Sequence, residues 1–92
     1  MDTAVEQVGH ESYILPFKLT QQQAKILALL MEVPVADAHA ISRRTGMSTE
    51  AKVAVHRLRN RMKEYDVTIS AKRYYGFWLE PDQKELVRKL MG

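Results

Sequence analysis

The chain has 92 residues, 46% of them hydrophobic, so it can bury one modest core and has no room for a second domain. It contains no cysteine, which excludes disulfide bonds and cysteine-bound zinc and leads us to expect a cytoplasmic protein. The longest apolar run, residues 26–31, is far shorter than the roughly 20 residues of a membrane span. Residues 1–10 are too acidic and polar for a signal peptide, so we expect no export.

The net charge of +3 is unevenly distributed along the chain. Residues 43–73 contain nine Lys or Arg and three acids, which gives +6, whereas the rest of the chain carries −3. A basic middle between acidic ends is typical of a surface that binds a polyanion, although solvated helix faces produce the same pattern. Charge alone leaves both interpretations open.

The first third of the chain predicts one helix after an irregular start. Residues 1–12 lack periodicity and predict a flexible N-terminal segment. Residues 13–19 form a short apolar run that a proline interrupts, which predicts an edge strand or an extended arm. Thr20 and Gln23 have the spacing of a capping box, and the apolar stripe after them predicts a helix that ends near Glu32.

Two more helices are predicted on either side of a turn. Pro34 ends the first helix because it lacks an N–H, and Asp37 is the expected cap of a short second helix that Gly46 ends. The third helix, residues 48–65, begins at a Ser or Thr cap and has apolar residues at spacings of four, three and four. These apolar residues are Ala51, Val55, Leu58 and Met62.

The apolar pattern changes after residue 66 from a helical period to the period of two that is typical of strands. Residues 67–79 are rich in β-branched and aromatic side chains and predict two short strands with a turn between them near residues 72–75. Core packing is expected for most of the aromatic rings. Alternation predicts one face with Tyr75, Phe77 and Leu79 and the other with Tyr74 and Trp78.

Residues 81–92 predict a C-terminal helix in which Asp82 and Glu85 have capping-box spacing. One side of this helix is apolar and would pack either on its own domain or on a second copy of the chain, as a homodimer. That side consists of Leu86, Val87, Leu90 and Met91. The fold expected from all these elements is mainly α with a small β hairpin (α+β), built on a three-helix core in residues 13–80.

A short helix, a turn at Gly46 and a longer helix predict a helix-turn-helix, and the hairpin that follows would be its wing. When the apolar stripe of the third helix faces the core, its opposite face carries cations, hydrogen-bonding groups and one apolar side chain. Such groups suit phosphates, base edges and thymine methyl groups of double-stranded DNA, although an ordinary amphipathic helix with a basic solvated side has the same pattern. The predicted DNA-binding residues are Thr49, Lys52, Val53, His56, Arg57, Asn60 and Lys63 on the helix, with Lys72 and Arg73 at the hairpin tip.

Four other side chains near this face have two interpretations each. Arg59 and Arg61 flank the apolar stripe, so they are expected to bind carboxylates or carbonyls within the domain, with the DNA backbone as the alternative. Tyr74 or Trp78 would stack on a base or fill a partner's pocket only if exposed, and core packing is the simpler expectation.

The sequence predicts neither a cofactor nor an enzyme. No glycine-rich phosphate loop, nucleophile elbow or paired acids are present. The histidines share no ligand spacing, and no cysteine completes a site, so no metal is expected. They are His10, His39 and His56.

From Leu19 onward the chain resembles the OmpR/PhoB-type winged helix-turn-helix output domain of bacterial response regulators, without a receiver domain. The stretch LTQQQAKILALLM is similar to that family's LT..E..LL..L, AKVAVHRLRNRM to VDVHIxRLRxKL, and ISAKRYYGFWLE to IxTVRGxGYRL. The chain departs from the pattern with Tyr74 at the wing glycine and Lys52 at a position that is commonly acidic. The resemblance implies a transcription factor in which His56 and Arg57 face the groove and Arg73 enters or borders the minor groove.

The leading hypothesis is therefore a bacterial or phage transcriptional regulator that binds double-stranded DNA sequence-specifically. Its helix 48–65 would lie in the major groove, and its wing, residues 67–79, on the backbone or in the minor groove. The alternative is a winged-helix interaction module that binds a regulator or a polymerase subunit through Tyr74 and Trp78.

Overall fold

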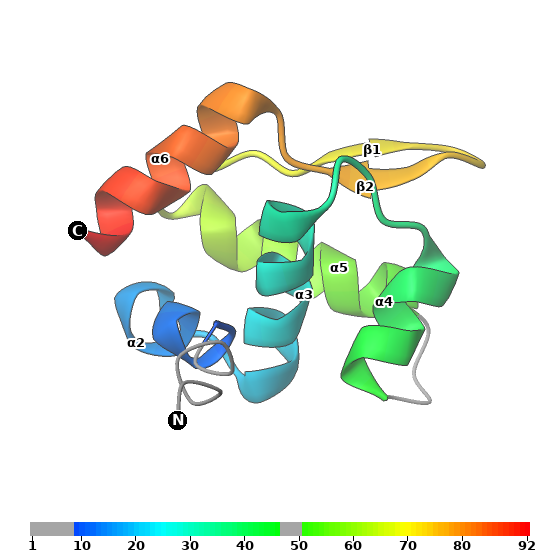
Figure 1. The fold of residues 1–92 in the computed structure, drawn as a ribbon, viewed down its shortest axis with the longest axis horizontal. Helices are drawn as coiled ribbons and strands as arrows, with labels where there is room; N and C mark the ends of the chain where they lie inside the picture. Colours follow the sequence, from blue (N-terminus) through cyan, green and yellow to red (C-terminus); the bar gives the residue numbers. More distant parts are fainter. Residues whose placement is uncertain (1–8, 47–50) are drawn as a thin grey trace.

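Helices form most of the fold, and a small antiparallel hairpin lies beside them (Figure 1). The computed structural model of the chain describes residues 9–46 and 51–92. The helical elements are η1 (Glu11–Tyr13), α2 (Ile14–Phe17), α3 (Gln21–Glu32), α4 (Ala38–Thr45), α5 (Ala51–Lys63) and α6 (Pro81–Met91). The strands β1 (Ser70–Lys72) and β2 (Gly76–Trp78) form a two-stranded antiparallel sheet. This arrangement is an α+β fold, as the sequence predicted.

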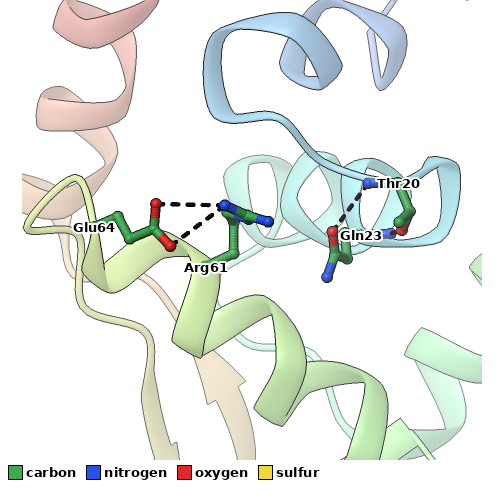
Figure 2. A network of polar contacts seen from close by, with 4 residues as sticks. All are labelled: Thr20, Gln23, Arg61 and Glu64. Atoms are coloured by element: carbon green, nitrogen blue, oxygen red, sulfur yellow. Dashed lines mark hydrogen bonds and ion pairs between the residues drawn. The ribbon is translucent and has the colours of Figure 1, made fainter.

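The predicted capping box begins α3 (Figure 2). The backbone N–H of Gln23 donates to Thr20 Oγ1 at 3.1 Å, and the backbone N–H of Thr20 donates to Gln23 Oε1 at 2.9 Å. The two bonds satisfy donors near the helix start that have no partner within the helix. The helix ends at Glu32 as predicted, and most of its apolar side chains are buried in the core.

The ends of α4 also follow the prediction. Asp37 Oδ1 accepts a hydrogen bond from the backbone N–H of Ala40 at 2.8 Å and so caps the first turn. At the other end, Gly46 has a left-handed backbone with a φ of 68°, and its N–H donates to the carbonyl of Ser42 at 2.8 Å. Glycine takes up this conformation without the steric cost that a β-carbon brings.

The edge strand or extended arm predicted for residues 13–19 is wrong, because this run forms the single helical turn α2. Its proline lies in the first turn, where the missing N–H leaves no helical bond unmade. Leu15 is 86% exposed, whereas Phe17 is fully buried and meets the ring of Tyr65 edge to face, with ring centroids 5.1 Å apart. A helical turn places Tyr13 and Phe17 on the same side, and both lie against the core.

The hairpin is attached to the segment between α3 and α4. In the hairpin, Ala71 pairs with Phe77. On the other edge of β2, Phe77 exchanges two backbone hydrogen bonds of 2.8 Å with Ala36. Below the strands, the apolar side chains of Val67, Ile69 and Leu79 are buried in the core, which is what their alternation predicts.

The face predicted for Tyr75 is wrong. Tyr75 is 56% exposed and meets the ring of Trp78 edge to face, with centroids 5.4 Å apart. The reason is that Tyr75 belongs to the turn and not to a strand, so strand alternation does not extend through it. Phe77 and Trp78 are both half-buried, and Phe77 packs against the core.

The last helix, α6, begins without the predicted capping box. Its N-terminal cap is Glu80, whose side chain makes no capping bond, and Pro81 occupies the first turn, where its fixed φ suits a helix start. Asp82 therefore lies inside the helix, and Glu85 pairs with Arg88 at 3.1 Å instead of reaching back to the cap.

The apolar side of α6 packs on its own domain. Val87 is fully buried in the core, and Leu86 and Met91 pack against it. Leu90 is 43% exposed. Val87 is therefore not available for the dimer contact considered from the sequence, because its side chain is already covered within the chain.

Two polar contacts secure α6 further. Lys84 Nζ donates to the carbonyl of Val33 at 3.1 Å, directly after the end of α3. Gln83 Oε1 accepts a bond from the backbone N–H of Thr68 at 2.7 Å. Within residues 9–46 and 51–92, no helix is long and apolar enough to cross a bilayer.

Candidate nucleic-acid interface

The buried side of α5 fixes which of its side chains face outward. Ala51, Val55, Leu58 and Met62 are buried in the core, as predicted from their spacing. Since an α-helix turns by about 100° per residue, the side chains between these positions lie on the opposite side. The described residues of the predicted DNA-binding face on α5 are all exposed, and they are Lys52, Val53, His56, Arg57, Asn60 and Lys63.

One detail of the predicted helix lies outside the comparison, and another differs from the structure. Thr49 and the predicted cap of the helix lie outside the described residues. At the other end, α5 stops at Lys63, before the predicted end at Tyr65. Tyr65 instead lies in the turn after the helix, where its ring covers Phe17.

The exposed side of α5 is strongly cationic. Between Ala51 and Lys63 the sequence has five Lys or Arg and no acid. In the part of the chain that the structure describes, one of these five cations forms an ion pair. Arg61 pairs with Glu64 at 3.3 Å. Figure 2 shows the guanidinium of Arg61 turned toward this carboxylate. The other four cations pair with no acid of residues 9–46 and 51–92, so within these ranges they are available to an anionic partner.

Arg59 is one of these four, which corrects the sequence analysis. The expectation for both Arg59 and Arg61 was a carboxylate or carbonyl partner within the domain. Arg61 has such a partner in Glu64, but Arg59 is exposed and forms no ion pair or hydrogen bond within residues 9–46 and 51–92. Its position, between the buried stripe and the outermost side chains, therefore adds a cation to the interface, a role that the sequence analysis gave only as the alternative.

His56 and Asn60 form a hydrogen-bonding pair on the outermost line of α5. His56 Nε2 and Asn60 Nδ2 lie 3.3 Å apart, one helical turn from each other. The contact restrains two side chains that can both donate to and accept from base edges. Val53, one turn before His56 and Arg57, adds an exposed apolar side chain to the same face.

The interface has a border on each side of α5. On one side, a hollow of about 310 Å³ separates α5 from the start of α3; it is lined by Thr20, Gln21, Gln22, Gln23, Ile26, Ala54 and Arg57. On the other side, a smaller hollow of about 60 Å³ lies between α5 and the segment that leads into β1; it is lined by Arg59, Lys63, Val67, Thr68 and Ile69. The cationic face of α5 is thus flanked by the capped end of α3 and by the base of the hairpin.

The hairpin tip carries more cations and an exposed ring. Lys72 and Arg73 are exposed, as predicted. The guanidinium carbon of Arg73 lies 5.5 Å from the centre of the Tyr74 ring, within the range of a cation–π contact. Tyr74 is 97% exposed, whereas Trp78 is half-buried and donates its indole N–H to Glu80 at 2.8 Å.

Metal-binding groups do not gather on this face. Across the described ranges, no three His, Cys, Asp or Glu side chains lie together so that they could hold a metal ion. Two acids near the interface are engaged within the domain, since Asp37 caps α4 and Glu64 pairs with Arg61. What the face offers is positive charge, hydrogen-bond donors and exposed aromatic and aliphatic surface.

The resemblance to OmpR/PhoB-type domains rests on three short stretches of sequence, and it remains a prediction. Two of those stretches supply α5, which carries the cationic face, and the hairpin, which lies beside it. Comparisons of the chain with protein-family models, with curated proteins and with solved structures found no match.

Proposed function

We propose that the chain is a sequence-specific double-stranded DNA-binding transcriptional regulator with a winged helix-turn-helix fold. In this proposal α4 and α5 are the helix-turn-helix, α3 completes the three-helix core, and the β1–β2 hairpin is the wing. The observation that carries it is the face of α5, where four cations without an ion pair to any described residue, a hydrogen-bonding pair and one apolar side chain lie together on one exposed helix surface.

The side chains divide by chemistry into two roles. Lys52, Arg59 and Lys63 suit phosphate contacts, since they are flexible or flank the face, and Lys72 and Arg73 suit the same role from the wing. Arg57 and the His56–Asn60 pair are exposed on the side of α5 opposite its buried stripe and suit base edges, because Arg binds guanine and Asn binds adenine with two hydrogen bonds each.

The first test is the salt dependence of binding to mixed-sequence duplex DNA. Each phosphate that the protein neutralises contributes about 0.9 to the slope of log affinity against log salt concentration. The free cations of α5 and the wing lead us to expect a slope of about 4 to 6. No retained DNA, or a slope near zero, would reject the proposal.

The second test separates base reading from charge. We expect Arg57→Ala to weaken binding by roughly 1–3 kcal/mol on a duplex selected from random DNA, and less on unselected DNA. Arg88→Ala is the matched control, because it removes the same charge from α6, where Arg88 pairs with Glu85. Equal effects of the two variants would show that α5 is not the reading surface.

The alternative, a winged-helix module that holds a protein partner, draws on the exposed ring of Tyr74. Its second anchor is weaker, because Trp78 is half-buried between Tyr75 and Glu80. A partner held by Tyr74 and Trp78 of the hairpin would also leave the cationic face of α5 unused. The salt titration discriminates between the two functions, since the alternative expects no DNA binding.

A further inference from the structure

Tyr74 has two properties that do not stabilise the fold. Its ring is 97% exposed, so it contributes almost nothing to the core. Its backbone has a left-handed φ of 64°, a conformation that disfavours a residue with a β-carbon. Among the described residues, positive φ values also occur at Gly46, Gly76 and Gly92 and at two residues with side chains, Lys18 and Asp66. Glycine would relieve the strain at Tyr74, and the ring that stands there instead is almost fully exposed, so a role outside the domain accounts for it better than packing does.

The turn holds the Tyr74 ring away from the body of the protein. Beneath it, Tyr75 and Trp78 stack edge to face, and the Trp78 indole is fixed by its bond to Glu80. In Figure 1 the tip of the hairpin lies at one end of the longest axis of the molecule. The ring therefore projects from a braced turn and needs little reorganisation before it contacts a partner.

The charges around the ring favour a polyanion as that partner. Arg73 lies over the ring, and the exposed Lys72 precedes it in the same turn. Asp37, across a hollow of about 330 Å³ that Tyr74 and Lys72 also line, has one carboxylate oxygen committed to the cap of α4. An aromatic ring beside two cations matches the edge of a nucleic-acid groove, where phosphates flank stacked bases.

The size of the molecule suits such a contact. Its longest extent is 38 Å, and one turn of B-DNA is about 34–36 Å long. With α5 in a major groove, the end of the hairpin would face a neighbouring minor groove, which is about 6 Å wide and too narrow for a helix but not for a single ring. Apolar and aromatic side chains that enter this groove unstack a base step and bend the duplex.

We infer that Tyr74 is a minor-groove wedge, which inserts its ring at a flexible pyrimidine–purine step while Lys72 and Arg73 contact the flanking phosphates. This inference rests on the proposed DNA-binding function and adds a residue that bends the DNA. Sequence preference at the wing then comes from how easily a step is deformed, and TA and CA steps are the easiest to unstack.

The test compares Tyr74→Gly and Tyr74→Phe with the unaltered chain. Binding and bending are measured on a mixed-sequence duplex of about 30 base pairs, roughly three helical turns. The duplex carries 2-aminopurine in its TpA steps to report unstacking and a donor–acceptor dye pair at its ends to report bending. We expect Tyr74→Gly to raise the unfolding temperature, weaken binding about tenfold and abolish both optical signals. Tyr74→Phe, which keeps the ring, should keep the affinity and both signals.

The outcomes separate this inference from the proposed function. If Tyr74→Gly binds and bends the duplex as the unaltered chain does, the wedge is rejected and the DNA-binding function stands. If the unaltered chain shows no salt-dependent DNA binding, both are rejected, and an exposed Tyr74 in a strained turn then indicates a protein partner. A loss of affinity accompanied by a lower unfolding temperature would also reject the wedge, because it would trace the effect to damage of the fold.

Discussion

Ala36 and Phe77 form two backbone hydrogen bonds of 2.8 Å, in which the N–H of each residue donates to the carbonyl of the other. This bridge fixes the hairpin to the segment that precedes α4. Gly76 lies next to the bridge with a φ of 140°. A β-carbon at Gly76 would lie 2.8 Å from the carbonyl oxygen of Ala36 and 3.0 Å from Val35 Cγ2. The position of the hairpin thus depends on a glycine that lets two backbones approach closely.

Gly76→Ala is therefore expected to destabilise the fold by roughly 2–3 kcal/mol, through backbone strain together with the steric clash. Gly46→Ala is the matched control: this glycine also has a positive φ, but a β-carbon there would meet no atom of the described residues within 4 Å. We expect it to cost roughly 1 kcal/mol, from the conformation alone. Denaturant unfolding measures both, and equal losses would mean that the close approach to Ala36 is unimportant.

Val87→Ala should destabilise the domain by roughly 2 kcal/mol, since it removes buried methyl groups and leaves a cavity in the core. Leu90→Ala, on the exposed side of the same helix, should cost less than about 1 kcal/mol. Thermal unfolding at several protein concentrations checks this pair. An unfolding temperature that rises with concentration, and that Leu90→Ala lowers, would indicate instead that α6 is stabilised by a second copy.

Tyr13 gives the stability a dependence on alkaline pH. Burial raises the pKa of the Tyr13 phenol, and the nearby Glu32 carboxylate raises this pKa further, whereas Arg88 opposes them. The folded state thus favours the neutral phenol, so its contribution is fully present below the ordinary tyrosine pKa of about 10 and is lost as the pH rises through the higher pKa of the folded state.

Tyr13→Phe is expected to remove this loss. The free energy of unfolding of the unaltered chain should fall more steeply above about pH 10 than that of the variant. Because both proteins share the same lysines and other tyrosines, the difference between their pH profiles isolates Tyr13. Parallel profiles over this range would contradict the raised pKa.

Arg59 and Arg61 should differ in their effect on DNA binding, given the proposed function. Arg59 forms no ion pair in the described ranges, so Arg59→Ala should lower the salt slope by about 0.9 and weaken binding to all sequences alike. Arg61 is held by Glu64, so Arg61→Ala should change the slope less. The same salt titration measures both variants, and the reverse order would mean that the Arg61–Glu64 pair opens on binding.

Local patterns predicted the parts of the fold that local chemistry determines. The Thr20–Gln23 capping box and the Asp37 cap require side chains three residues from their partners, a spacing that the sequence displays directly. Likewise, once the buried stripe of α5 is known, helical geometry decides that Arg57 and Asn60 face outward.

The parts that the sequence did not predict depend on neighbours distant in the chain. Phe17 forms a helical turn because Tyr65 completes its packing, and nothing near Phe17 in the sequence indicates that partner. The pair of Arg61 and Glu64 is an exception, because its spacing of three residues is visible in the sequence, whereas the exposure of Arg59 is seen only in the structure. Tyr75 was assigned by strand alternation, which fails where a turn begins.

The bridge between Ala36 and Phe77 also affects how the protein behaves at high concentration. An unpaired strand edge can recruit the same edge of another molecule and begin aggregation. Here the inner edge of β2 is occupied by Ala36, and the outer strand, β1, has only three residues, ending in the exposed Lys72. Two copies that joined through β1 would gain few hydrogen bonds. The hairpin is thus a poor template for further strands, which leaves its tip available for another kind of partner.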